Sequence, residues 1–270
     1  MNVLLTGANG YLGQHTSIQL QQAGHFVLPT NHDPNDWEEH LNSRAIDVVV
    51  HLSWLAKAGN GDPAGQRNSL RNTKRLLSAV DDQECRIIFA STASVYGPSE
   101  AMKKETDSLN PNCCYTRAKR LAEKWLAHSL PQEDVTVLRF GSLMGRGMTK
   151  TRTDLVVNAF AQLGHSGRIV EVWNPEAWKP IIHVKDAAGI IREAVEGRWE
   201  GVYNVASQCQ QERLIANLVR LQTGCEVRLK KGDGQRSCRL DCVKLAQKLL
   251  AKGMPPVIWR SIPEAVREFS

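Results

Sequence analysis

The stretch LTGANGYLG, residues 5–13, follows a short apolar segment and carries three glycines at the spacing G-x-x-G-x-x-G. The segment from Asn2 to Thr6 is typical of a short buried strand, and the residues after Gly10 have the spacing of a helix. Because glycine has no Cβ, such a loop turns tightly and lets N–H groups at the start of the helix face a diphosphate. The pattern predicts a strand, a loop and a helix that bind the pyrophosphate of a dinucleotide.

The predicted helix has a packing face and an end signal. Leu12, Thr16, Leu20 and Ala23 fall on one face, and Gly24 suits the position just after a helix. This strand, loop and helix context favours phosphate binding over the alternative, an ordinary glycine-rich turn.

Composition limits the classes of protein to which the chain can belong. The 270 residues are 42% hydrophobic and 23% charged, which fits a globular chain of one large or two closely associated domains. The net charge of +6 is spread along the chain without a basic block, so we expect no nucleic-acid partner. No apolar run approaches the roughly 20 residues that span a bilayer. With a strand in place of a leader at its start, the chain is expected to be cytoplasmic and not membrane-bound.

The seven cysteines include no paired C-x-x-C spacings. This usage predicts reduced thiols in a reducing compartment, with neither a disulfide framework nor a metal site.

Further along, short β-rich runs alternate with helical stretches. The runs are Phe26 to Leu28, Ile46 to Leu52, Arg86 to Ser91 and Val135 to Phe140. Helical spacing is clear around 70–80 and again over 114–128. This order predicts an α/β fold, a Rossmann-type doubly wound parallel sheet with a small C-terminal substrate-binding lobe. We expect a dinucleotide-binding domain over 1–145 and a substrate-binding lobe mainly over 146–270, partly interleaved with the first.

Two further segments carry candidate chemistry. Tyr115 and Lys119 are four residues apart, so on a helix they share one face, and an ammonium near a phenol lowers the phenol pKa from about 10. Thr92 and Ser94 follow a predicted strand at the edge where ligands of such sheets bind. Taken singly, the Tyr and Lys could share a solvated helix face by chance, and Ser94 could simply form a local turn.

These motifs together resemble the extended short-chain dehydrogenase/reductase family. The resemblance is carried by the glycine loop, VVVHLS (48–53), STASVYG (91–97), Tyr115-x-x-x-Lys119, LRFGSLMG (138–145), IHVKDA (182–187) and YNV (203–205). It implies that Tyr115 is a general acid/base, that Lys119 is its partner and a ribose ligand, and that Thr92 binds the reacting oxygen. Family members include sugar-nucleotide epimerases, dehydratases and ketoreductases, so a nucleotide sugar is the expected substrate.

The cofactor is expected to be NADP or NAD, with a slight preference for NADP. The preference arises because no carboxylate stands at Asn31, where an acid would repel a 2′-phosphate, and Asp33 lies two residues further on. The alternative is that Asn31 hydrogen-bonds the diol of NAD. The expected cofactor contacts are Gly7, Asn9, Gly10, Tyr11, Leu12, Gly13, Asn31, Leu52, Ser53, Tyr115 and Lys119.

The resemblance also shapes the expected reaction. Dehydratases of the family carry Asp and Glu after the threonine, whereas this chain has Ala93 and Ser94, which argues against a 4,6-dehydratase. A 4-ketoreductase is favoured because the C-terminal part is short for the family. A 4-epimerase with tightly held NAD is the alternative, and a non-catalytic dinucleotide-binding sensor or scaffold is a third hypothesis.

Substrate contacts are the least specified by the sequence. The expected residues are Thr92, Ser94, Ser142, Arg213 and Arg236, although either arginine could be a solvated surface residue. Asp186 fits an N-cap and His183 a packed strand position. The stretch from Trp173 to Pro180 fits a loop that covers a pocket or one that anchors to the core. By resemblance, a homodimer is expected.

Overall fold

The computed structural model describes residues 1–30, 37, 39–41, 45–55, 62–81, 85–232, 237–251 and 259–270. The chain divides into two compact units, each built from separate segments of sequence. The first unit comprises Met1–Val95, Pro111–Arg139 and Ala188–Tyr203, and the second comprises Tyr96–Asn110, Phe140–Ala187 and Asn204–Ser270. The functional division at residue 145 stays a prediction.

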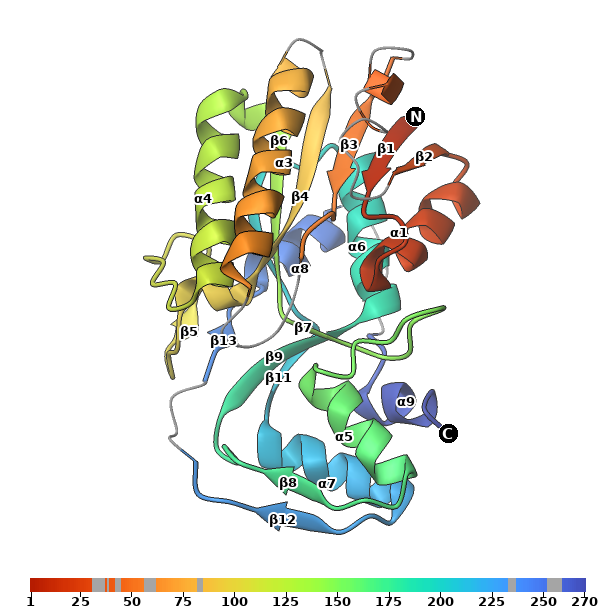
Figure 1. The fold of residues 1–270 in the computed structure, drawn as a ribbon, viewed down its shortest axis with the longest axis vertical. Coiled ribbons are helices and arrows are strands. Elements are labelled where there is room, and N and C mark those ends of the chain that lie inside the picture. The colour runs from red at the N-terminus through yellow and green to blue at the C-terminus, as the bar shows by residue number, and fades with distance from the viewer. Residues whose placement is uncertain are drawn as a thin grey trace. The chain divides into compact units, whose positions relative to one another are not determined.

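A six-stranded parallel sheet forms the centre of the first unit, in the order β10-β6-β4-β3-β1-β2 (Figure 1). The strands are β1 (Asn2–Thr6), β2 (Phe26–Thr30), β3 (Val48–His51), β4 (Arg86–Thr92), β6 (Val135–Phe140) and β10 (Gly201–Val205). The strand order reverses beside β1, because β2 lies on one side of it and β3, β4 and β6 follow on the other. Ligands of doubly wound sheets bind at such a switch point, beyond the carboxyl ends of the strands. The predicted α/β class and sheet type are confirmed.

The sequence explains which strands lie inside the sheet and why β2 can lie at its edge. Val48–His51 and Val135–Phe140 are buried at every residue, as expected for inner strands covered on both faces. Strand β2 continues two residues beyond the predicted Leu28 and includes Pro29. A proline has no N–H to donate, and β2 tolerates it because it is an edge strand.

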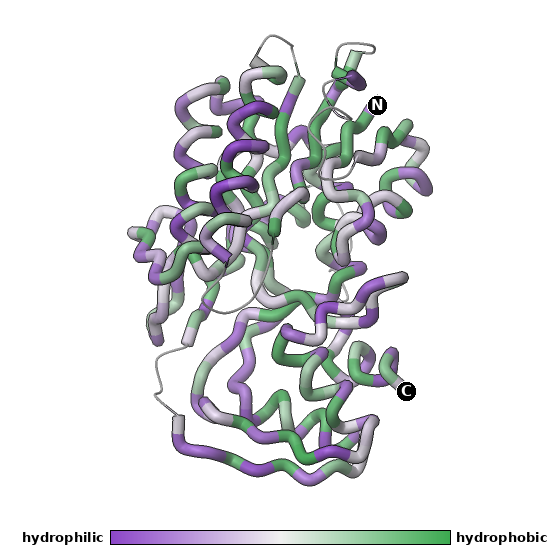
Figure 2. Tube along the Cα trace, in the orientation of Figure 1, coloured by the Kyte–Doolittle hydropathy of each residue, from purple (hydrophilic) through white to green (hydrophobic). Residues whose placement is uncertain are grey.

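Helices α3 and α4 pack side by side, as Figure 1 shows. The helical elements of the first unit are α1 (Tyr11–Gln22), α3 (Pro63–Asp81), α4 (Cys114–Ser129) and the short η2 (Gln132–Asp134), while η1 (Ala93–Tyr96) and α6 (Val184–Glu196) run from one unit into the other. Helix α1 ends as predicted, with Gly24 in the left-handed region at φ +80°. Polar residues dominate much of α3, whereas the sheet strands are largely apolar (Figure 2).

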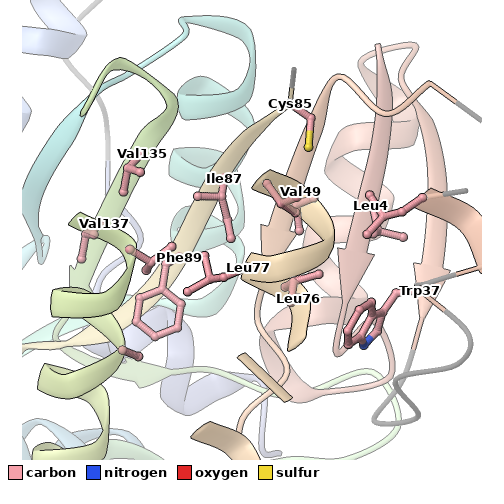
Figure 3. Close-up of a cluster of buried hydrophobic side chains, with 14 of the residues drawn as sticks. Leu4, Trp37, Val49, Leu76, Leu77, Cys85, Ile87, Phe89, Val135 and Val137 are labelled. Atoms are coloured by element: carbon pink, nitrogen blue, oxygen red, sulfur yellow. The ribbon is translucent and has the colours of Figure 1, made fainter. Parts of the chain in front are cut away.

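One apolar core of the first unit lies where α3 and α4 pack on the sheet. Figure 3 shows Leu77 of α3 beside Phe89 of β4, with Val49 and Leu4 on neighbouring strands. Phe89, Val49 and Leu4 have no exposed surface. The apolar periodicity predicted for α3 therefore supplies this packing.

The second unit has three smaller sheets and its own core. Its strands are β5 (Met102–Lys103), β7 (Ser142–Met144), β8 (Val170–Val172), β9 (Trp178–His183), β11 (Gln208–Gln211), β12 (Val227–Leu229) and β13 (Arg239–Leu240). They pair as β11-β9-β7, β12-β8 and β13-β5. Its helices are α5 (Val156–His165), α7 (Glu212–Thr223), α8 (Val243–Leu250) and α9 (Ile262–Arg267). Buried residues of α5, α7, α9 and β8 form the core.

The segment from Trp173 to Asp186 differs from its sequence-based expectation at Asp186 and agrees with it at His183. The N-cap assigned to Asp186 is wrong, because α6 begins at Val184 and Asp186 lies in its first turn. Its carboxylate instead accepts the Arg260 N–H at 2.8 Å and pairs with the Arg260 guanidinium. His183 is a fully buried strand residue, as expected. Trp173 is 57% exposed, whereas Trp178 begins β9.

No described helix is long and apolar enough to cross a membrane. Within the same residues, no group of three or more His, Cys, Asp or Glu side chains is placed to bind a metal ion.

Candidate active site

The loop between β1 and α1 is closely packed, and its glycines are needed for that packing. A Cβ on Gly13 would lie 2.1 Å from the Gly7 carbonyl oxygen, and one on Gly7 would lie 2.8 Å from the Ser53 nitrogen. Gly7 also has φ +73°, a conformation that side chains disfavour. The loop therefore cannot take this shape with other residues at Gly7 and Gly13.

The start of α1 fits a diphosphate. Gly10 is the N-cap, no side chain caps the helix, and no acidic residue stands in its first turn. The partial positive charge and N–H groups of a helix N-terminus favour an anion at this position. Asn9 and Gly10 are exposed, while Tyr11 and Leu12 are half-buried in the first turn. The residues present thus fit the pyrophosphate of a dinucleotide.

The residues after β3 lie against the glycine loop. The Leu52 N–H donates to the Thr6 carbonyl at 3.2 Å, and the Ser53 N–H donates to Thr6 Oγ1 at the same distance. Leu52 and Ser53 therefore lie at the switch point of the sheet, beside the glycine loop. The sequence predicts that this loop and these two residues contact the same cofactor. Asn31, assigned to the adenosine ribose, lies outside the described residues.

Thr92, Tyr115 and Lys119 all belong to the first unit. Tyr115 and Lys119 are one turn apart on α4, and Tyr115 packs half-buried against the core. Lys119 Nζ donates to the Ala90 carbonyl at 2.6 Å, two residues before Thr92 at the end of β4. This contact brings the Lys119 face of α4 to the carboxyl end of β4.

Thr92 and Ser94 form a local turn. Thr92 Oγ1 accepts the Ser94 N–H at 3.2 Å, and the Thr92 hydroxyl keeps a proton that it can donate. Thr92 is half-buried and Ser94 is exposed. The hydroxyl in this turn is that of Thr92, so the turn considered for the Ser94 hydroxyl and its role in substrate binding both stay predictions.

The Lys119 side chain is buried and is only 3% exposed. Burial moves its pKa well below the ordinary value for lysine, while the negative charge of Glu123 opposes that change. Glu123 is one turn further along α4. The charge of Lys119 thus depends on which groups surround it in the interior.

Glu123 belongs to a buried network at the base of the site. Its carboxylate accepts hydrogen bonds from the Ser91 hydroxyl and from Arg139, whose Nη2 lies 2.8 Å away. Both side chains of the ion pair are at most 8% exposed. Unpaired, either charge would be costly in this setting, so the pair fixes α4 to β4 and β6.

His51 occupies a second buried network at the end of β3. Thr6 Oγ1 lies 2.8 Å from Nδ1, and Thr73 Oγ1 lies 3.0 Å from Nε2. Because Thr73 donates its own hydroxyl proton to the Ser69 carbonyl, we assign the imidazole proton to Nε2. Burial, and then the charge of Lys119, lower the His51 pKa to about 3, so the ring is neutral.

The substrate residues predicted after residue 140 belong to the second unit. Ser142 is a half-buried residue of β7. Arg213 is 45% exposed and pairs with Glu176 at 3.0 Å. Arg236 lies outside the described residues. The roles of all three stay predictions.

The sequence reading missed the residues that support the site. Ser91, His51 and Arg139 stand in the quoted motifs without a predicted role, and Glu123 lies outside those motifs. A signal was available, because Arg139 is the one charged residue in a strand that is otherwise apolar or hydroxyl-bearing, and a buried arginine needs a partner. The i,i+4 spacing of Lys119 and Glu123 was a second signal.

The sequence model of the NAD dependent epimerase/dehydratase family matches residues 3–206. The chain belongs to this family. The predicted resemblance is therefore confirmed, and the glycine loop, Thr92, Tyr115 and Lys119 all lie inside the matched segment.

Individual epimerase/dehydratase relatives are similar but distant. An epimerase family protein, YfhF of Bacillus subtilis, is 27% identical over 220 residues, covering 73% of this chain and 70% of the relative. The UDP-glucose 4-epimerase of Yersinia pestis is 28% identical over 182 residues, and the match covers 54% of each protein. The chain thus spans only about half the length of some of the curated relatives that it matches.

Solved structures support the fold of the family. The Thermus thermophilus UDP-glucose 4-epimerase in complex with NAD has a TM-score of 0.83 and 24% identity, covering 100% of this chain and 99% of that one. The Thermotoga maritima UDP-glucose 4-epimerase with UDP-glucose also has a TM-score of 0.83, at 21% identity, with 100% and 97% covered. At these identities the likeness establishes the fold.

Proposed function

We propose that the chain is an NAD-dependent epimerase that acts on a hydroxyl-bearing carbon of a nucleotide-activated sugar. The observation that carries the proposal is the Lys119 contact with the Ala90 carbonyl at 2.6 Å, which brings the helix with Tyr115 to the end of β4 beside Thr92. Family membership and relatives with epimerase names support the same reaction class.

Each side chain has a distinct part in this proposal. The Tyr115 phenolate takes a proton from the reacting sugar hydroxyl, and the phenol so formed later returns a proton to the same oxygen. The charge of Lys119 favours the phenolate form of Tyr115. The Thr92 hydroxyl donates to the reacting oxygen and positions it. When bound, NAD would supply the hydride acceptor and donor that the reaction requires.

We propose NAD as the cofactor. The earlier preference for NADP rests on Asn31, which lies outside the described residues, and the comparisons give it no support. The family description and the complex of the Thermus enzyme both name NAD. The helix N-terminus without an acidic residue suits the diphosphate of either cofactor.

The substrate contacts follow from the same proposal. Ser94, Ser142, Arg213 and Arg236 are the candidates, and a guanidinium suits a diphosphate because it donates two parallel hydrogen bonds. In that role Arg213 must exchange its exposed partner Glu176 for the substrate, and an exposed ion pair opposes such an exchange by only about 1 kcal/mol or less.

The direct test supplies purified protein with NAD and a panel of UDP-, dTDP- and ADP-linked sugars. Conversion of one sugar to its epimer, followed by NMR and without net change in absorbance at 340 nm, is the expected result. The 4-ketoreductase hypothesis predicts instead that a 4-keto sugar nucleotide consumes NADH or NADPH in stoichiometric amounts. Binding of NAD without turnover of any sugar, in the parent and in Tyr115→Phe alike, would support a sensor or scaffold.

We also propose a homodimer that pairs through α3 and α4. These helices lie side by side, and Leu121 of α4 is 38% exposed. Sedimentation at micromolar concentration is expected to give twice the mass of the chain. A monomer throughout that range would contradict the proposal.

A further inference from the structure

The Lys119 ammonium lies against two aromatic rings. Its Nζ is 4.0 Å from the centre of the Trp54 ring and 4.5 Å from the centre of the Phe89 ring. Both distances are well within the roughly 6 Å at which a cation is attracted to a ring face. The same nitrogen donates to the Ala90 carbonyl at 2.6 Å.

The Trp54 ring is fixed in orientation. Its Nε1–H donates to Gln66 Oε1 at 2.9 Å, and Gln66 in turn donates from Nε2 to the Leu55 carbonyl at 2.8 Å. The ring meets Phe89 edge-on, with centres 5.8 Å apart at 65°. Trp54 is 8% exposed and Phe89 is fully buried. A ring fixed in this way presents its face to the ammonium without further ordering.

The groups around Lys119 explain why contact with the two aromatic rings affects its charge. Burial disfavours the ammonium and lowers its pKa, and Glu123 on the same helix opposes that effect. Part of the Glu123 charge is already neutralised by Arg139 of β6. His51 of β3 is neutral and contributes no negative charge, and Tyr115 lies one turn before Lys119 on α4. The electron-rich ring faces supply further attraction in a setting where water cannot.

We propose that Trp54, together with Phe89, is a positioning residue that keeps the Lys119 ammonium charged and directed at the end of β4. Trp54 follows β3 by three residues and acts through Lys119. The consequence for catalysis rests on the proposed function of the Tyr115 and Lys119 pair, whereas the effect on Lys119 itself does not.

The test measures the titration of Lys119 directly. Protein labelled with ¹³C at the lysine Cε is titrated by NMR, and the Lys119 signal is assigned by its loss in Lys119→Arg. Trp54→Leu keeps an apolar side chain but removes the ring, so we expect the Lys119 pKa to fall by about one unit, a tenfold change in proton affinity. Trp54→Phe retains a ring and is expected to give a smaller fall.

The matched control is Trp37→Leu. Trp37 is a buried tryptophan of the same core, but the cation over its ring is Arg75. We expect the Lys119 titration in this variant to match that of the parent. Thermal unfolding of all three variants separates loss of the contact from loss of the fold.

Two results would overturn the inference. One is an unchanged Lys119 titration in Trp54→Leu or, if that variant does not fold, in Trp54→Phe. The other is an equal shift in Trp37→Leu, because that would make core packing the cause. The titration requires neither NAD nor a sugar, so a clear shift in protein whose Tyr115→Phe variant keeps full turnover would contradict the proposed function while leaving this inference intact.

Discussion

The end of β4 in the first unit and the surface around Arg213 in the second unit both contain arginine–glutamate pairs, but the two environments differ. Arg139 and Glu123 are at most 8% exposed and share a network with Ser91. Arg213 and Glu176 are 45% and 64% exposed. A buried pair is costly to break and fixes neighbouring elements in place, whereas an exposed pair exchanges partners at little cost. In the proposed function, the reaction chemistry depends on the first kind of pair, and the contact with the substrate diphosphate depends on the second.

The largest effect on activity is expected from a substitution of Tyr115, the proposed proton-transfer residue of the first unit. Removal of the proton-transfer group in Tyr115→Phe should lower turnover of the sugar nucleotide by about 100-fold to 10,000-fold, without change in the unfolding midpoint. The control is Tyr203→Phe, which keeps the ring packed on Trp199. If Tyr115→Phe and Tyr203→Phe had the same activity as the parent, Tyr115 would not be the acid/base.

Removal of Arg139 from the buried Arg139–Glu123 pair tests whether this pair contributes more to stability than the exposed pair does. Arg139→Met leaves the Glu123 charge without its partner in the interior, so the free energy of unfolding should fall by about 3 to 5 kcal/mol. Urea unfolding followed by circular dichroism measures the difference. A loss below 1 kcal/mol would place Arg139 in the same class as exposed arginines and remove the contrast between the two regions.

The lowered pKa of His51 in the first unit makes the folding stability depend on pH. Its pKa is about 3 when folded against 6.5 as the ordinary value, so between these values the unfolded chain binds the extra proton. Stability therefore falls as the pH falls through that window, by about 2 kcal/mol between pH 7 and pH 5. In His51→Gln, which keeps a hydrogen-bond donor and an acceptor, this contribution should vanish.

The stabilities of parent and His51→Gln are compared above pH 5 because the contribution of Glu268 to stability changes at lower pH. Glu268 of the second unit is partly buried, which by itself raises its pKa, but hydrogen bonds from His183, Lys185 and the Arg146 N–H lower it to about 2. Its stabilising effect is lost only at lower pH, below the ordinary value of 4.5. Equal slopes of stability against pH in parent and variant would show that His51 is not the group responsible.

The smallest effect on stability is expected at the exposed pair. Arg213→Met should lower the free energy of unfolding by at most about 1 kcal/mol. If Arg213 contacts the substrate diphosphate as proposed, the KM for the sugar nucleotide should rise while kcat stays close to the parent value. An unchanged KM would remove Arg213 from the substrate site.

The sequence predicted most of the fold because its signals are local. The glycine spacing, the apolar run at Val48–His51 and the helical spacing of α4 each depend on neighbours in the chain. The contacts of Lys119 with Trp54 and Ala90 could not be predicted in the same way. Trp54 and Ala90 come from two different strand ends, and only the assembled sheet brings them to the helix that carries Lys119.

The incorrect prediction of an N-cap at Asp186 has a similar cause. The motif around 182–187 resembles a helix start, but the partner of the carboxylate is Arg260, far along the chain. A long-range ion pair of this kind leaves no periodic trace in the sequence.

The most direct test of the central claim is a calorimetric titration of NAD into the parent, Gly13→Ala and Gly189→Ala. A Cβ at position 13 would lie 2.1 Å from the Gly7 carbonyl, whereas one at position 189 meets nothing within 4 Å. We predict saturable one-to-one binding to the parent and to Gly189→Ala, and strongly weakened binding to folded Gly13→Ala. Absence of NAD binding to the parent, or equal binding to all three proteins, would contradict the assignment of the glycine loop as the cofactor site.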